Sequence, residues 1–246
     1  MKVLICIDDT DNLESRGTGE LAENLAAEIQ DRKWGHCEFV TRHQLLVHPD
    51  IPYTSHNSSM CFAADIDAQH LPALMERAKA FLVEESAPGS DPGLAIAIPE
   101  RLSDETALID FGQRAKNEVL RKQDAYDLAA GLDIHLSEHG GTGQGVVGAL
   151  AGIGLRMSGN DGRIKGWLRI PTNDGLAKVS DILTQFDLGG VRTISGELLA
   201  HDDLITVGEK PKAVFLGGKP YLLVSPLAEA DTVRWQTSSK RELKQF

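Results

Sequence analysis

The first part of the chain alternates between short apolar runs and helical periodicity. Residues 2–7 form a short, mostly apolar run that acidic residues end, which predicts a buried strand. After a polar turn, Leu21, Leu25 and Ile29 recur every four residues and predict a helix over residues 20–33. The chain is therefore expected to open with a strand, an acidic loop that contains glycine, and a helix.

The same patterns continue to about residue 155. Apolar runs predict strands at residues 38–47, 60–66 and 94–99. Helical periodicity covers residues 71–86 and most of 104–131. In the second of these helical stretches, the expected core contacts are Leu108, Phe111, Ala115, Val119 and Tyr126.

Beyond residue 155 the pattern changes to one helix and several short β segments. The helix is expected at residues 175–186, and Gly217-Gly218 is expected to form a hairpin turn. The β segments are expected at residues 191–199, 203–208, 212–216 and 221–225. We therefore predict an α/β fold, a mixed sheet with flanking helices, over residues 1–155, and a smaller α+β region over residues 156–246.

Composition narrows the functional classes. The 246 residues include 41% hydrophobic and 25% charged residues, as in globular proteins. The formal net charge of −11 disfavours a large surface for the phosphate backbone of nucleic acids. The apolar runs are too short for a signal peptide or a membrane helix. The three cysteines contain no CxxC pair, so we expect a cytoplasmic protein without a zinc ribbon.

An acidic motif, Ile7-Asp8-Asp9-Thr10-Asp11, follows the first strand. Carboxylates at the end of a buried strand lie where α/β proteins form their sites, and hard oxygen ligands suit Mg²⁺. A solvated acidic turn is the alternative. An EF-hand calcium site is excluded, because Leu13 stands where that loop requires a ligand. A haloacid-dehalogenase-like phosphatase, with Asp9 as the nucleophile, stays open as an interpretation.

Two further segments carry candidate binding residues. Arg16, Gly17 and Thr18 precede the first helix, where backbone N–H groups favour anions; Thr18 is expected to cap the helix, contact phosphate or accept a phosphoryl group. The polar loop after residue 47 contains two prolines, which stiffen it. Its candidate substrate residues are His48, Tyr53 and Asn57, with an ordinary surface loop as the alternative.

A glycine-rich segment is the most unusual stretch: seven of the 15 residues from Gly140 to Gly154 are glycine. Successive N–H groups in such a loop form a nest for anions, and a tight structural turn is the alternative. The segment is a weak match to a dinucleotide-binding fingerprint, since Gly152 and Gly154 are expected to interrupt the helix that follows. The candidate cofactor-binding residues are Gly141, Thr142, Gly143, Gln144 and Gly145, and His139 beside them is a candidate substrate residue.

These motifs, in this order, resemble the archaeal tRNA 2-agmatinylcytidine synthetase family. The resemblance covers about residues 1–155. Its matching segments are Ile7–Asp11, Arg16–Thr18, His48–Tyr53 with Asn57, Asp91–Gly93 and Gly143–Ala151. Enzymes of that family use ATP to join agmatine to a cytidine of an isoleucine tRNA, through a kinase-like N-terminal domain.

The resemblance implies roles for residues of this sequence. Asp8 and Asp11 match positions that serve metal and phosphate chemistry, and Thr18 matches a threonine involved in phosphoryl transfer. Asp8, Asp9 and Thr18 are therefore the catalytic candidates, with Arg16 and Gly17 on the cofactor side. The family's OB and zinc-ribbon modules have no counterpart in this sequence, so we do not expect tRNA binding.

We therefore expect an enzyme that uses ATP and Mg²⁺ for phosphoryl transfer or ligation onto a small molecule, with an amine as the family-level expectation. Three alternatives stay open: a nucleotide-binding regulatory protein without turnover, a metal-dependent phosphohydrolase, and tRNA binding through a basic face that the sequence does not reveal. A homo-oligomer is compatible with the composition, and no membrane partner is expected.

Overall fold

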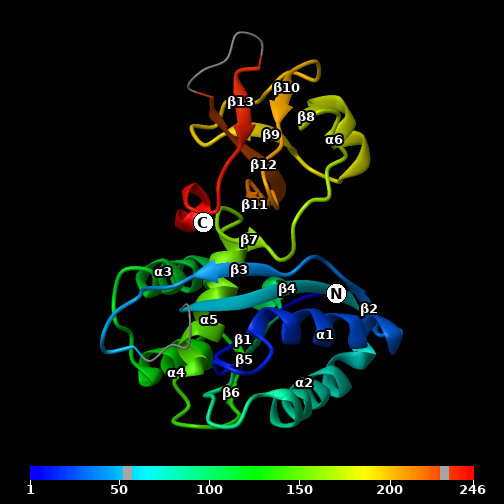
Figure 1. Cartoon of the computed structure of the whole chain (residues 1–246). Helices are drawn as coiled ribbons and strands as arrows, with labels where there is room; N and C mark the ends of the chain where they lie inside the picture. Colours follow the sequence, from blue (N-terminus) through cyan, green and yellow to red (C-terminus); the bar gives the residue numbers. More distant parts are fainter. Residues whose placement is uncertain (52–56, 228–232) are drawn as a thin grey trace. The chain divides into compact units, whose positions relative to one another are not determined.

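The structure is a computed structural model that describes residues 1–51, 57–227 and 233–246 (Figure 1). The chain divides into two compact units, Met1–Ser158 and Gly159–Phe246. Among the helices of the described residues, none has both the length and the apolar character that crossing a membrane requires. The predicted α/β class is confirmed, and the strand pairing is mixed. The parallel pairs lie in the second unit, whereas the strand pairs described for the first unit are antiparallel.

The first unit is built on an antiparallel sheet with the strand order β6-β5-β1-β4-β3, and β2 also pairs with β4. Strand β1 lies between β5 and β4, so both of its edges are hydrogen-bonded. The strands are β1 (Lys2–Asp8), β2 (Gly35–Cys37), β3 (Thr41–Gln44), β4 (Ser58–Ile66), β5 (Gly93–Ala97) and β6 (His135–Glu138).

Helices cover both faces of this sheet (Figure 1). One face carries α1 (Thr18–Asp31) and α2 (Leu71–Glu85), and the other carries α3 (Glu105–Ala115), α4 (Lys122–Gly131) and α5 (Gly145–Met157). Two 3₁₀ helices, η1 (Ala68–His70) and η2 (Pro99–Arg101), complete the unit. Helix α5 is apolar on every side and almost entirely buried, as expected for a helix enclosed by a sheet and other helices.

Alternation along β1 divides the core of this unit into two layers. Val3, Ile5 and Ile7 pack on the α1 and α2 side, whereas Leu4 and Cys6 pack on the α5 side. Because successive side chains of a strand point to opposite faces, the last residue of β1 belongs to the α5 side.

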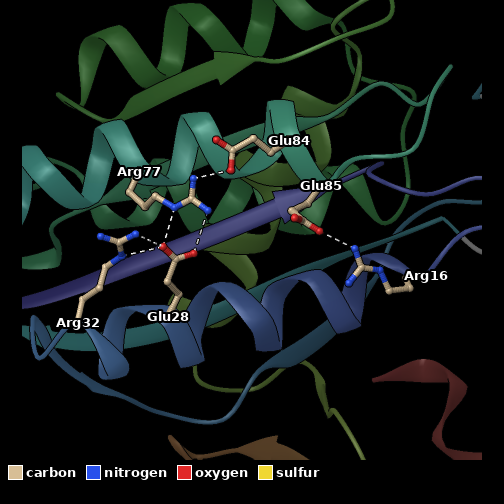
Figure 2. A network of polar contacts seen from close by, with 6 residues as sticks. All are labelled: Arg16, Glu28, Arg32, Arg77, Glu84 and Glu85. Carbon is tan, nitrogen blue, oxygen red and sulfur yellow. Dashed lines mark hydrogen bonds and ion pairs between the residues drawn. The ribbon is translucent and has the colours of Figure 1, made fainter.

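Ion pairs join α1 to α2 on the outer surface of this layer (Figure 2). Arg77 of α2 donates to Glu28 of α1 through Nε at 2.7 Å and through Nη2 at 3.0 Å, and Nη1 donates to Glu84 at 2.7 Å. Arg32 also pairs with Glu28 at 2.7 Å. Hydrogen bonding to Arg77, followed by that to Arg32, lowers the pKa of Glu28 against the opposing effect of desolvation.

The second unit contains a mixed sheet with the order β7-β11-β12-β13-β10-β8, in which β9 pairs in parallel with β12. The Gly217-Gly218 turn between β11 and β12 is confirmed, with φ angles of 55° and 74° that suit glycine. The elements are β7 (Arg163–Ile164), β8 (Leu176–Lys178), α6 (Val179–Gln185), β9 (Gly190–Thr193), β10 (Leu204–Thr206), β11 (Ala213–Leu216), β12 (Lys219–Pro226), β13 (Trp235–Thr237) and η3 (Glu242–Gln245).

Four details of the sequence interpretation were wrong. The helix expected at residues 175–186 begins only at Val179, because Leu176–Lys178 form β8. The strand expected at residues 38–47 is confined to Thr41–Gln44. Val119 is 45% exposed rather than a core residue, because it lies in the connection between α3 and α4. Helix α5 continues through Gly152 and Gly154, since tertiary packing on both sides outweighs the low helix propensity of glycine.

Candidate functional site

Asp8 ends β1 and lies against α5. It belongs to the same face of the strand as Cys6, and the two side chains lie opposite Gly148 and Gly152, one helical turn apart on α5. A Cβ atom at Gly148 would overlap the Asp8 carboxylate, so the glycine creates the space that the carboxylate fills. The acidic motif and the glycine-rich segment, 140 residues apart in sequence at these two positions, therefore meet.

Burial and neighbouring charges act against ionisation in the acidic motif. Desolvation raises the pKa of Asp8 well above its usual value; the charges of Asp9 and Asp11 add to this, and the backbone N–H of Asp9 opposes it. Desolvation and the charges of Asp91 and Asp11 raise the pKa of Asp9 to about 6. None of these charges is positive, so a cation arriving here would relieve repulsion.

Thr18 is held by the acidic motif rather than used as a helix cap. The N-cap residue of α1 is Gly17, and Thr18 is the first residue of the helix. Its hydroxyl donates to Asp11 Oδ1 at 3.0 Å and accepts from the Thr10 N–H at 3.4 Å. A hydroxyl beside a carboxylate at this distance has the geometry of a nucleophile and its base.

Thr10 is the most buried polar residue of the motif. Its side-chain hydroxyl has no hydrogen-bond partner among the described residues, and the residue is 1% exposed. Its backbone carbonyl accepts from the Ala87 N–H at 2.9 Å, which fixes the acidic loop to the segment after α2. An unsatisfied buried hydroxyl is an exception to the rule that buried polar groups are hydrogen-bonded, and here it lies in the same motif as the buried Asp8.

Arg16 is tied to the end of α2. Its Nη2 lies 2.5 Å from Glu85 Oε2, and both side chains are partly exposed (Figure 2). Gly17 follows it, and a Cβ atom at Gly17 would lie 3.8 Å from Asp11 Oδ2. The two predicted cofactor residues thus border the acidic motif, and in this conformation the Arg16 guanidinium is paired with a carboxylate.

The glycine-rich loop is joined to the acidic motif through Asp91. The Asp91 N–H donates to the Asp9 carbonyl at 3.0 Å. Its carboxylate accepts from the Thr142 hydroxyl at 2.5 Å and from the Gly143 N–H. Gly143, with a φ angle of 79°, adopts the left-handed conformation that favours glycine. The loop therefore already binds an anion, which is a carboxylate of its own chain.

The rest of the loop leads directly into α5. Gln144 is the N-cap residue, and Gly145 begins the helix. Gly145 packs against the backbone of Asp91 and Gly93 so closely that a Cβ atom would overlap it. The N-terminus of α5, where the helix dipole is positive, is thereby held at the carboxyl end of β1.

Three of the four predicted substrate residues lie in the part of the chain that the structure describes. Asn57 fixes the loop after β3, because its Nδ2 donates to the Leu46 carbonyl at 2.6 Å. His48 is partly exposed, and its Nδ1 lies 3.7 Å from Asp50. His139 donates its backbone N–H to Pro92 at 2.8 Å, and desolvation, followed by the charge of Lys79, lowers the pKa of its imidazole. Tyr53 lies outside the described residues.

Two residues of the site were missed as candidates, Asp91 and Lys122. Lys122 Nζ donates to the Thr142 carbonyl at 2.9 Å and pairs with Glu138 at 2.9 Å. The motif Asp91-Pro92-Gly93 could have indicated that Asp91 belongs to the site. The strand register that places Gly93 opposite Asp8 could not be predicted from the sequence. Lys122 had no local signal, since it begins an ordinary amphipathic helix.

Mg²⁺ fits the donor set of the acidic motif. Among the described residues, no group of three or more His, Cys, Asp and Glu side chains is arranged to hold a metal ion alone. Mg²⁺ usually takes one or two carboxylates and completes its shell with substrate phosphates and water. Asp8 and Asp11, which lie within one motif of like charges, offer such a partial set.

Comparisons with known proteins relate this chain to one enzyme family. No family model matches the sequence. The apo structure of TiaS, an agmatidine synthetase of an isoleucine tRNA, aligns over 63% of this chain with 25% identity and a TM-score of 0.54. The complex of TiaS with that tRNA and ATP aligns over the same share with 26% identity and a TM-score of 0.55. The resemblance that the motifs indicated is therefore confirmed.

The matches cover only part of the relatives. An uncharacterised protein of Methanocaldococcus jannaschii is 30% identical over 155 residues, which are 63% of this chain and 50% of that protein. The two TiaS structures are covered to 35% and 36% of their length. This chain thus spans half or less of the relatives that it matches.

Proposed function

We propose that this chain binds ATP with Mg²⁺ at the acidic motif and uses it for phosphoryl transfer or ligation onto a small molecule, with an amine as the second substrate. The observation that carries the proposal is the convergence of Asp8, Asp91 and the glycine-rich loop at one end of β1. The similarity to an enzyme solved in complex with ATP supports a related ATP-dependent function.

In this proposal, different residues of the chain bind the metal ion, orient the Thr18 hydroxyl and bind the phosphates. Asp8 and Asp11 would hold Mg²⁺, which when bound offsets the charge of the phosphates. Asp11 accepts a hydrogen bond from the Thr18 hydroxyl at 3.0 Å and keeps that oxygen oriented. Arg16, Gly17 and the loop from Gly141 to Gly145 would supply donors to the phosphates.

The second substrate is assigned only by class. The surplus of carboxylates in the first unit, 25 Asp and Glu against 13 Lys and Arg, favours a cationic molecule such as an amine. His48, Tyr53, Asn57 and His139 are the proposed contacts. The second unit carries 11 acidic and 12 basic residues, so the proposal includes no tRNA. The three free thiols fit a reducing compartment, and we place the protein in the cytoplasm.

The test is a product screen with ATP, Mg²⁺ and a panel of amines that includes agmatine. AMP, ADP, phosphate and amine adducts are separated and identified by mass spectrometry. We expect amine-dependent cleavage of ATP that is lost in Thr18→Val and retained in Thr18→Ser, because serine keeps the hydroxyl beside Asp11. Asp110→Asn, on the exposed face of α3, removes one charge elsewhere and serves as the control.

Two other outcomes would replace the proposal. Saturable ATP binding without cleavage, whatever amine is present, would identify a nucleotide-binding regulatory protein. A metal-dependent phosphohydrolase would release phosphate from simple phosphate esters whether or not ATP is present. That activity would be lost in Asp9→Asn.

A further inference from the structure

The peptide between Thr142 and Gly143 is engaged on both sides. On one side, the Thr142 hydroxyl and the Gly143 N–H both donate to the carboxylate of Asp91. On the other side, the Thr142 carbonyl accepts from Lys122 Nζ at 2.9 Å. Glu138 pairs with the same ammonium group at 2.9 Å. This short stretch of loop therefore lies between a carboxylate and an ammonium group.

The donors that hold Asp91 are those that bind phosphate in other proteins. A backbone N–H and a hydroxyl converge on one anion, and Gly141 and Gly143 have the positive φ angles, 57° and 79°, of an anion-binding nest. Lys122 adds a charged ammonium close by, and hydrogen bonding to Glu138 raises its pKa. Phosphate accepts hydrogen bonds from backbone N–H and hydroxyl donors of this kind, and the ammonium charge on the carbonyl side of the peptide favours an anion there.

The position of Asp91 among other carboxylates is electrostatically unfavourable. Its backbone is bonded to Asp9, and its charge is one of the causes that raise the pKa of the Asp9 carboxyl. Hydrogen bonds from the loop offset this repulsion in the ligand-free chain. An anion that supplied more acceptors to the same donors would release the Asp91 side chain without moving its backbone.

We propose that the Thr142 hydroxyl and the Gly143 N–H form a subsite for a phosphate group of the nucleotide, which Lys122 supports from the carbonyl side of the same peptide, and that the Asp91 carboxylate occupies this subsite until the phosphate replaces it. The inference rests on the proposed function and adds an exchange of anions to it. Asp91 then lowers the apparent affinity for phosphate, because only the fraction of molecules with an open subsite binds. Lys122 acts in the opposite direction, because its positive charge on the carbonyl side of the peptide favours an anion on the N–H side.

In the alternative interpretation, the Asp91 carboxylate has a structural role and stabilises the conformation of the loop. If that interpretation holds, removing the carboxylate disorders the loop and weakens the binding of phosphate. The two accounts predict opposite signs for the same substitution, so a binding measurement separates them.

The experiment titrates tripolyphosphate without metal, and ATP with Mg²⁺, into the full chain, three test variants and one control variant. We expect Asp91→Ala to bind tripolyphosphate about tenfold more tightly than the wild type, Asp91→Asn to lie between them, and Lys122→Met to bind about tenfold more weakly. Asp110→Asn is the control for the loss of one negative charge and should change affinity less than twofold. Circular dichroism and thermal unfolding verify that each variant is folded.

Each result decides the question. Equal or weaker binding by Asp91→Ala and Asp91→Asn would overturn the exchange, and unchanged binding by Lys122→Met would show that Lys122 does not support the subsite. If Asp91→Ala does not fold, Asp91→Asn decides, because it retains the shape of the side chain without its charge. ATP binding by the wild type with no gain in the Asp91 variants would reject only the exchange, whereas no binding by any folded protein would reject the nucleotide site as well.

Discussion

Asp9 combines partial burial with two carboxylate neighbours, and its pKa of about 6 makes the stability of the protein depend on pH. The unfolded carboxyl titrates near 3.9, so between these values the folded chain binds more protons than the unfolded chain. The stabilising effect of protonation is full below about pH 4 and is lost as the pH rises through 6. Asp8, whose pKa is also raised, acts in the same direction.

We therefore predict that Asp9→Asn is more stable than the wild type at pH 7, by about 1–2 kcal/mol after allowance for solvent screening at this partly exposed group. Its free energy of unfolding should also fall less steeply between pH 5 and 7. Urea unfolding at a series of pH values measures both quantities, and Asp110→Asn should follow the wild-type curve. A variant that is less stable at pH 7 would contradict the assigned environment.

Single residues also mark the limit of inference from sequence. The apolar run at residues 2–7 was sufficient to place Asp8 at the end of a buried strand, but the sequence did not show that Asp8 meets the glycine-rich loop. The role of Asp91 was not predictable, because it depends on the antiparallel register that sets Gly93 opposite Asp8 and on the positive φ angle of Gly143. Neither quantity is a property of local sequence.

At the scale of elements, α5 determines how the site is assembled. Its glycines allow close approach on several sides: Gly148 to Asp8, Gly152 to Cys6 and Gly154 to the backbone of α3. The low helix propensity of glycine predicted an interrupted helix, because propensity takes no account of the elements that pack against the helix. The helix continues through its glycines because these are the positions at which a side chain would overlap a neighbouring element.

Gly154→Ala tests this packing away from the candidate site. A Cβ atom there would overlap the Leu108 carbonyl, which is backbone and cannot rotate away. We predict a loss of about 1–3 kcal/mol in the free energy of unfolding. Gly131→Ala at the end of α4 is the matched control: a Cβ atom would meet nothing within 4 Å, so stability should be unchanged or rise by up to about 1 kcal/mol. Equal effects of the two substitutions would refute the packing argument.

At the scale of the whole molecule, the division into two units has a consequence for function. Every residue of the candidate site lies in Met1–Ser158, as does the surplus of acidic residues. The sequence indicated two regions from a change of pattern near residue 155, but it offered no motif that assigns a role to the second. The short strands there pair both in parallel and antiparallel, an arrangement that local patterns do not specify.

We predict that a fragment containing residues 1–158 folds and binds ATP with Mg²⁺ within about threefold of the full chain's affinity, because each unit has its own buried core. Thermal unfolding and calorimetric titration of the fragment measure these two properties. A folded fragment that binds at least tenfold more weakly would show that the second unit contributes to the site.

The most direct measurement is a calorimetric titration of ATP with Mg²⁺ into the wild type and into the double variant Asp8→Asn/Asp11→Asn. The control is Asp110→Asn/Asp127→Asn, which removes the same number of charges from exposed helix positions. The account predicts saturable binding by the wild type and by the control, and loss of binding in a folded Asp8/Asp11 variant. No saturable binding by the folded wild type, or equal binding by all three proteins, would contradict the placement of the nucleotide at the acidic motif.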